Sequence, residues 1–203
     1  MDSDLRDAVG ALRAVFERRK LGSKWGTTPA ELIEAFKKEY RVPPRYRAFL
    51  AEVNPIEVET VTPVEKVRLL SSEKLREGQV GFGVAEDGTS LVTGKEGDWK
   101  KSWVVVAMSS HFGDPYFLDV SKLDAEGDCP VYAAQKTEKG TWKTTLAASS
   151  FASFIHILAL GMELASGFGE AVFDEADDGA FREQFAPKIK AFDPAAARAK
   201  HWS

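Results

Sequence analysis

The sequence predicts an α+β domain in which helices pack around a central sheet that is mainly antiparallel or mixed. Apolar residues recur with the helical period at both ends of the chain, and short β-prone runs separated by glycine fill the middle. The spacing between these runs leaves no room for the helical crossovers that parallel neighbours require. We therefore expect antiparallel neighbours joined by loops, with extra helices at the N- and C-terminal ends.

The composition predicts a soluble protein with one domain. The chain has 203 residues, of which 44% are hydrophobic, so it can bury a full core without disulfides. Its 27 basic and 31 acidic residues give a net charge of −4, and no apolar run is long enough to span a bilayer. We therefore expect neither direct nucleic-acid binding nor membrane insertion. The single Cys129 excludes an internal disulfide, and the acidic start lacks a secretory signal, which together favour the cytoplasm.

The first quarter of the chain predicts a small helical layer. Residues 4–19 carry the apolar pattern of an amphipathic helix. After a loop, Thr28 and Glu31 have the spacing of a capping box, with a proline between them, and predict a helix over residues 29–40. Two prolines then interrupt this helix, and a second helical stripe ends near Asn54.

Short strands are predicted from about residue 57 onward. Residues 80–84 and 90–92 flank an Asp-Gly dipeptide, which favours a hairpin because glycine tolerates positive φ. The unbroken apolar run at residues 103–107 predicts a central strand that is covered on both faces. A helical turn is expected over residues 71–77, and further strands at residues 67–70, 116–120, 131–134 and 141–145.

The last quarter is again helical. Ser150 begins a helix whose apolar stripe continues until Gly167 marks its exit. After an acidic stretch at residues 174–178, a stripe from Phe181 to Phe192 predicts a final helix, followed by a tail at residues 194–203.

The loop after the central run contains every residue type of a hydrolytic triad, in Ser109, Ser110, His111 and Asp114. Neighbours within one loop rarely place a nucleophile, a base and an orienting acid in line, so a small hydrolase is the least favoured function. The three histidines lack metal-ligand spacing, and the glycines near Gly81 precede β-like residues where a phosphate loop would need a helix. We therefore predict no catalytic, metal or cofactor site.

Two features favour binding to another protein. One is the acidic loop with Asp124, Glu126 and Asp128, together with the stretch at residues 174–178, although charge runs are usually solvated loops. The other is the aromatic density around the predicted sheet, most of which must form core while a few side chains at the rim would anchor an interface. These aromatic residues are Phe82, Trp99, Trp103, Phe112, Tyr116, Phe117, Tyr132 and Trp142.

Residues 103–110 and 113–119 resemble the central motif of the SUKH superfamily, which includes fungal regulators of cell-wall glucan synthesis and many bacterial toxin-immunity proteins. Segments on both sides follow the order of the family, among them the helix that ends in Asn54. Pro55 stands where the family usually has glycine, so this turn must be built differently.

The resemblance covers about residues 28–165. The flanks, residues 1–27 and 166–203, match no family pattern, and we expect them to be helical extensions that pack on the same domain.

The resemblance implies a non-enzymatic, cofactor-free domain that binds a protein. As an immunity protein it would neutralise a toxin domain by covering the toxin's active face; the alternative is a regulatory scaffold like the fungal members. Asp114 and Asp119 match the motif and are expected first to stabilise a turn and a strand end. The expected motif or partner-binding residues are Trp99, Trp103, Phe112, Asp114, Tyr116, Asp119, Asp124, Glu126 and Asp128.

Overall fold

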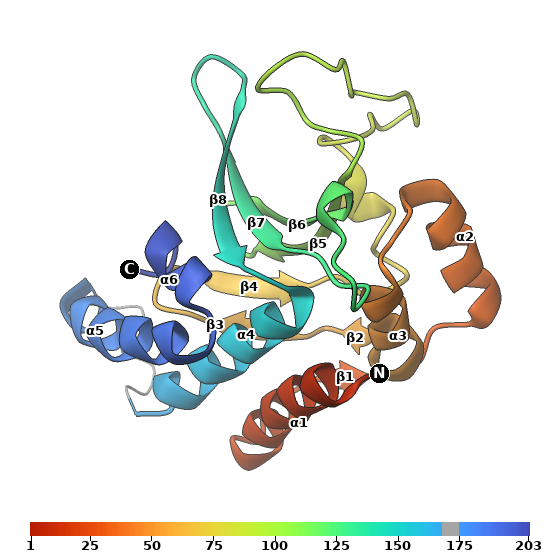
Figure 1. Cartoon of the computed structure of the whole chain (residues 1–203). Helices are drawn as coiled ribbons and strands as arrows, with labels where there is room; N and C mark the ends of the chain where they lie inside the picture. Colours follow the sequence, from red (N-terminus) through yellow and green to blue (C-terminus); the bar gives the residue numbers. More distant parts are fainter. Residues whose placement is uncertain (168–174) are drawn as a thin grey trace.

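A six-stranded antiparallel sheet forms the centre of the molecule in the computed structural model, which describes residues 1–167 and 175–203 (Figure 1). Each strand pairs with the next along the chain, and a separate pair of short strands lies near the N-terminal helices. The sheet comprises β3 (Glu59–Val61), β4 (Lys66–Leu69), β5 (Trp103–Ser109), β6 (Pro115–Asp119), β7 (Val131–Lys136) and β8 (Trp142–Ala148), and the pair comprises β1 (Lys24–Trp25) and β2 (Pro55–Ile56). The predicted α+β class with antiparallel neighbours is therefore confirmed.

The two faces of the sheet bury different cores. Val104 and Val106 on β5 belong to the main core, which the helices share, whereas Val105 belongs to a smaller aromatic core on the opposite face. A bulge between Val105 and Ala107 changes the register with β6. Because both faces are covered, β5 is the buried central strand that its unbroken apolar run predicted.

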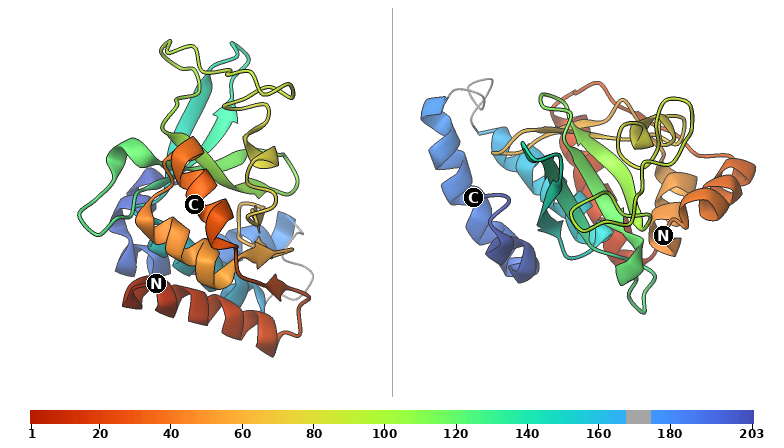
Figure 2. Two further views of the ribbon diagram at one scale, coloured as in Figure 1. Left: turned by 90° about the vertical axis from the view of Figure 1, so that its right-hand side faces the viewer. Right: turned by 90° about the horizontal axis from the view of Figure 1, so that it is seen from above.

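Helices lie on one side of the sheet, and the long loop between β4 and β5 lies on the other (Figure 2). The N-terminal helix α1 packs along α4, which begins at the predicted cap Ser150. Side chains of α1, α4 and α5 contribute to the same core as the sheet. The helices are α1 (Ser3–Arg18), α2 (Ala30–Tyr40), α3 (Pro44–Val53), α4 (Phe151–Ala165), α5 (Glu175–Phe192) and α6 (Pro194–Ala199). Within the described ranges, no helix is long and apolar enough to cross a membrane.

The hairpin predicted over residues 80–92 forms only in part. At the Asp-Gly turn Gly88 has a φ of +83°, and across it the N–H of Leu91 donates to the carbonyl of Gly83 at 3.0 Å, but no regular strands form on either side. Gly81 adopts a φ of +86°, and its N–H donates to the carbonyl of Val84 at 2.8 Å, so the chain turns back before a strand can form. Only isolated bridges join this segment, at Val84 to Val80 and to Ser90. A short 3₁₀ helix, η1 (Glu77–Gln79), precedes it.

The capping box predicted at Thr28 does not form. The N-cap of α2 is Pro29, which makes no side-chain capping bond. Thr28 is buried, and its backbone N–H donates to the carbonyl of Leu50 on α3 at 3.1 Å. Tertiary contact with α3 thus takes precedence over the local capping signal.

The predicted tail at residues 194–203 contains a helix and a core residue. Asp193 caps α6 by accepting from the N–H of Ala196 at 2.9 Å, and it also accepts from the N–H of Ser149 at the end of β8 at 2.7 Å. Trp202 is buried, and its indole N–H donates to the carbonyl of Ala147 at 2.7 Å. The C-terminal segment therefore closes the main core beside β8.

Gly161 on α4 permits close contact between this helix and the edge strand β3. A Cβ atom at this position would lie 2.4 Å from the backbone oxygen of Val61. We therefore expect Gly161→Ala to lower the free energy of unfolding by about 1–3 kcal/mol in urea denaturation, since backbone must shift to admit the methyl group. Gly10→Ala on the exposed face of α1 is the matched control, because nothing lies within 4 Å of that position. It should raise stability by about 0.5–1 kcal/mol, and equal effects of the two substitutions would contradict the close contact.

A partly buried polar network joins the C-terminal segment to the sheet. The Tyr116 hydroxyl donates to Oε1 of Glu65 at 2.5 Å and lies 2.9 Å from Nε2 of His201, which therefore donates to it. Burial lowers the pKa of His201 to about 4, so the folded state keeps this imidazole neutral.

This histidine predicts a pH dependence of stability. Between about pH 6.5 and pH 4 the unfolded chain binds a proton at His201 that the folded chain does not, so its contribution to stability is lost as the pH falls through this window. Urea unfolding at about pH 7.5 and about pH 5 should show a larger loss for the wild type than for His201→Gln, whose amide retains a donor. Equal losses in both proteins would contradict this assignment.

Candidate functional site

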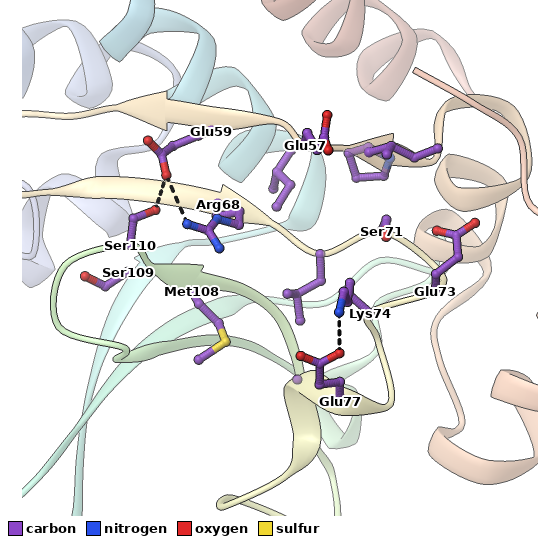
Figure 3. Close-up of a pocket in the computed structure, with 15 residues that line it drawn as sticks. Glu57, Glu59, Arg68, Ser71, Glu73, Lys74, Glu77, Met108, Ser109 and Ser110 are labelled. Atoms are coloured by element: carbon purple, nitrogen blue, oxygen red, sulfur yellow. Dashed lines mark hydrogen bonds and ion pairs between the residues drawn. The ribbon is translucent and has the colours of Figure 1, made fainter. Parts of the chain in front are cut away.

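An open groove of about 1040 Å³ crosses the sheet face that points away from the helices (Figure 3). Its floor includes Leu70 and Met108, which border the smaller aromatic core. One wall comes from the β2–β3 segment and the other from the turns between β4 and η1. The lining residues are Pro55, Ile56, Glu57, Glu59, Arg68, Leu69, Leu70, Ser71, Glu73, Lys74, Glu77, Gly78, Met108, Ser109 and Ser110.

A buried glutamine holds the wall formed by η1 against the sheet. The Gln79 side chain donates to the carbonyl of Val105 and accepts from its N–H, both at 2.9 Å. Leu69 is the last residue of β4 that pairs with β5, and the Gln79 side chain occupies the next part of the edge of β5. The wall is therefore fixed by a side chain that imitates a strand's backbone pairing.

Asn54 at the end of α3 orients the carboxylate of Glu73 at the groove. This asparagine is completely buried; its Oδ1 accepts from the N–H of Ser72 at 2.8 Å, and its amide donates to Oε1 of Glu73 at 3.2 Å. Partial burial would raise the pKa of Glu73, but hydrogen bonds from its own N–H, Ser71, Asn54 and Ser72 outweigh it and lower the pKa below its ordinary value. Glu73 is thus an exposed, oriented anion.

Acidic side chains outnumber basic ones around the groove. Glu57, Glu59, Glu73 and Glu77 lie around it, against two cations in its lining, Arg68 and Lys74 (Figure 3). Glu59 lies 3.5 Å from Arg68 and Glu77 lies 2.6 Å from Lys74, and the side chains of both cations are more than half exposed. Among the described residues, no cation forms an ion pair with Glu73.

Four of the nine predicted motif or partner-binding residues lie in the interior. Trp99 and Tyr116 are core residues, and Asp119 and Asp128 are buried carboxylates. Asp119 accepts from the N–H of Ser121 at 3.2 Å and from the hydroxyl of Ser102 at 3.1 Å, which is the strand-end role expected for it. These four side chains contribute to the fold and offer no surface for docking.

Asp128 stabilises the start of α4, which corrects its reading as part of an acidic docking loop. It accepts from the N–H groups of Cys129, Phe151 and Ala152, at 2.7, 2.9 and 3.2 Å, and pairs with Arg45 at 3.0 Å. The positive end of the helix dipole favours this carboxylate. In the local sequence Asp128 is only one member of a charge run. Its role could not be predicted there, because the helix start that it contacts lies more than twenty residues later in the chain.

The other predicted residues remain at least partly accessible. Phe112 is 68% exposed, Asp124 and Glu126 lie on an exposed loop, and Trp103 and Asp114 are partly buried. Burial raises the pKa of Asp114, against a hydrogen bond from Gln135 that lowers it. Partner binding by these residues stays a prediction. The acidic stretch at residues 174–178 lies outside the residues whose side chains the structure describes.

The loop with the residue types of a hydrolase shows no triad geometry. The Ser109 hydroxyl accepts a hydrogen bond from the N–H of Phe112 at 3.1 Å, and the Ser110 hydroxyl donates to Glu59. His111 is exposed, and its ring packs against Phe112. In the part of the chain that the structure describes, no group of three or more histidine, cysteine, aspartate or glutamate side chains is placed to hold a metal ion.

The groove was not predicted from the sequence. Its carboxylates come from separate segments that only the tertiary fold brings together. One local signal was present: Glu73 and Glu77 are four residues apart on a predicted helical turn, which places both on one side of it.

Comparison with known families places residues 27–156 in the SMI1 / KNR4 family (SUKH-1). Searches of curated proteins and of solved structures found no match. The matched range covers well over half of the chain and includes α2, α3, the whole sheet and the first part of α4. It confirms the resemblance carried by the motif on β5 and β6. The chain therefore belongs to the SMI1 / KNR4 family (SUKH-1).

Proposed function

We propose that this chain is a bacterial immunity protein that acts in the cytoplasm, binding a toxin domain and covering its active face. The family is compatible with a non-enzymatic protein-binding role. The observation that carries the proposal is the open groove with an acidic rim, bordered by the loop that presents Phe112. An exposed aromatic side chain beside a polar rim is the usual composition of a protein interface.

The charge of the groove favours a toxin that acts on nucleic acid. Such enzymes bind phosphates with basic side chains, so an acidic surface complements their active face and speeds association. A typical interface buries about 800 Å² on each partner, so the groove would form its centre and neighbouring loops its periphery. Occlusion requires no chemistry from the chain, in agreement with the engaged hydroxyls of Ser109 and Ser110.

The test is coexpression with the toxin domains encoded beside this chain's gene. We expect restored growth and a complex of one chain with one toxin domain, measured by size-exclusion chromatography with light scattering. If every neighbouring toxin stays active when the chain is in excess, the immunity role is contradicted. That result would favour the alternative of a regulatory scaffold with an endogenous partner.

A further inference from the structure

The groove combines apolar side chains with charged side chains, most of them acidic. On its sheet side, Glu59, Arg68 and Met108 are cross-strand neighbours on β3, β4 and β5. Leu70 forms apolar floor near the turn that carries Glu73 and Glu77. In an extended peptide successive side chains point in opposite directions, so one set can contact such a floor while the other reaches the rim. A groove with an apolar floor and an acidic rim therefore accommodates an extended segment whose two faces differ.

The cations of the groove hold its carboxylates only weakly. Side chains of Arg68 and Lys74 are 59% and 62% exposed, and exposed ion pairs contribute little to stability. A basic side chain from a partner can therefore replace them at small cost. Glu73 needs no such exchange, because its described partners are hydrogen-bond donors that leave its negative charge uncompensated.

We propose that the groove docks an extended segment of the toxin domain that alternates lysine or arginine with apolar residues, with Glu73 as the principal anchor. This inference rests on the proposed function for the identity of the partner. The hydrogen bonds from Asn54 fix the anchor in place, so less side-chain entropy is lost when a cation binds.

The first experiment tests the groove without any toxin. A short synthetic peptide that alternates valine with arginine is titrated into the ¹⁵N-labelled full chain, and amide shifts are followed by NMR. We expect the shifts to concentrate on groove residues 55–59, 68–78 and 108–110, to weaken with added salt, and to be absent with a peptide that carries glutamate in place of arginine. Shifts elsewhere, or none with the arginine peptide, would overturn the proposal.

The second experiment uses the toxin domain and charge reversal. Glu73→Lys and Glu77→Lys should each weaken its binding by about tenfold or more, because like charges then oppose in the interface. Asn54 donates to Glu73, whereas Glu77 pairs with the exposed Lys74, so the Glu77 variant remains informative if Glu73→Lys disturbs the fold. Glu138→Lys, on the exposed β7–β8 turn, is the matched control and should bind within about twofold of the wild type.

The outcomes separate the two proposals. If the wild type binds the toxin and both groove variants bind equally well, the groove assignment is wrong while the immunity role stands. If no toxin is bound or neutralised, the immunity role is wrong, and the peptide titration alone decides whether the groove accepts a basic segment.

Discussion

Replacing Asp128 with alanine is expected to lower the free energy of unfolding by about 3–5 kcal/mol, because it removes one partner of a buried ion pair. The Arg45 side chain, which is 12% exposed, would keep only Asp2 as its ionic partner. Three backbone N–H groups, including those of Phe151 and Ala152 at the start of α4, would also lose their acceptor. Urea unfolding followed by circular dichroism measures the change.

The control comes from the same acidic loop. Glu126 is exposed, so Glu126→Ala should change stability by no more than about 0.5 kcal/mol. Asp128→Asn, which keeps one carbonyl acceptor but loses the charge, should have an intermediate effect. If Asp128→Ala and Glu126→Ala unfold at the same urea concentration, the interior role of Asp128 is refuted.

Replacing Trp202 with alanine should destabilise the chain by about 3–5 kcal/mol, which is the usual cost of deleting a buried tryptophan. Its ring lies parallel to that of Tyr116, with centroids 6.0 Å apart, and edge-on to Phe185 at the same distance. The substitution also leaves the carbonyl of Ala147 without its indole donor. The midpoint of urea unfolding reports the loss.

Ser203→Ala provides the comparison for Trp202, because this neighbouring side chain is exposed. It should leave the midpoint within experimental error of the wild type. A stable, cooperatively folded Trp202→Ala protein with an unchanged midpoint would show that the C-terminal segment is not part of the core.

The elements with strong periodicity could be predicted from the sequence. The stripe after Ser150 gave α4 and its cap, and the unbroken run at residues 103–107 gave the buried central strand. Both signals arise from burial, because burial determines the spacing of apolar residues along a helix or a strand. The helix α6 was missed because its six residues are too few to show a periodic stripe.

The failures have a common physical cause in long-range contacts. Thr28 has the spacing of a cap, yet its N–H pairs with α3; Asp128 lies in an acidic loop, yet it meets the start of α4. The groove follows the same rule, since Asn54 and Glu73 are 19 residues apart in the chain and in hydrogen-bond contact. Partners at such separations leave no local pattern in the sequence. The family motif indicates the order of the helices and strands, but it does not indicate which side chains meet at the surface.

Hydrogen–deuterium exchange of the chain, alone and bound to the neighbouring toxin domain, identifies the surface that the toxin covers. We expect binding to slow exchange at residues 55–59, 68–78 and 108–112, which line or border the groove. Slower exchange confined to the loop at residues 124–128 or to the β7–β8 turn, with the groove unchanged, would contradict it.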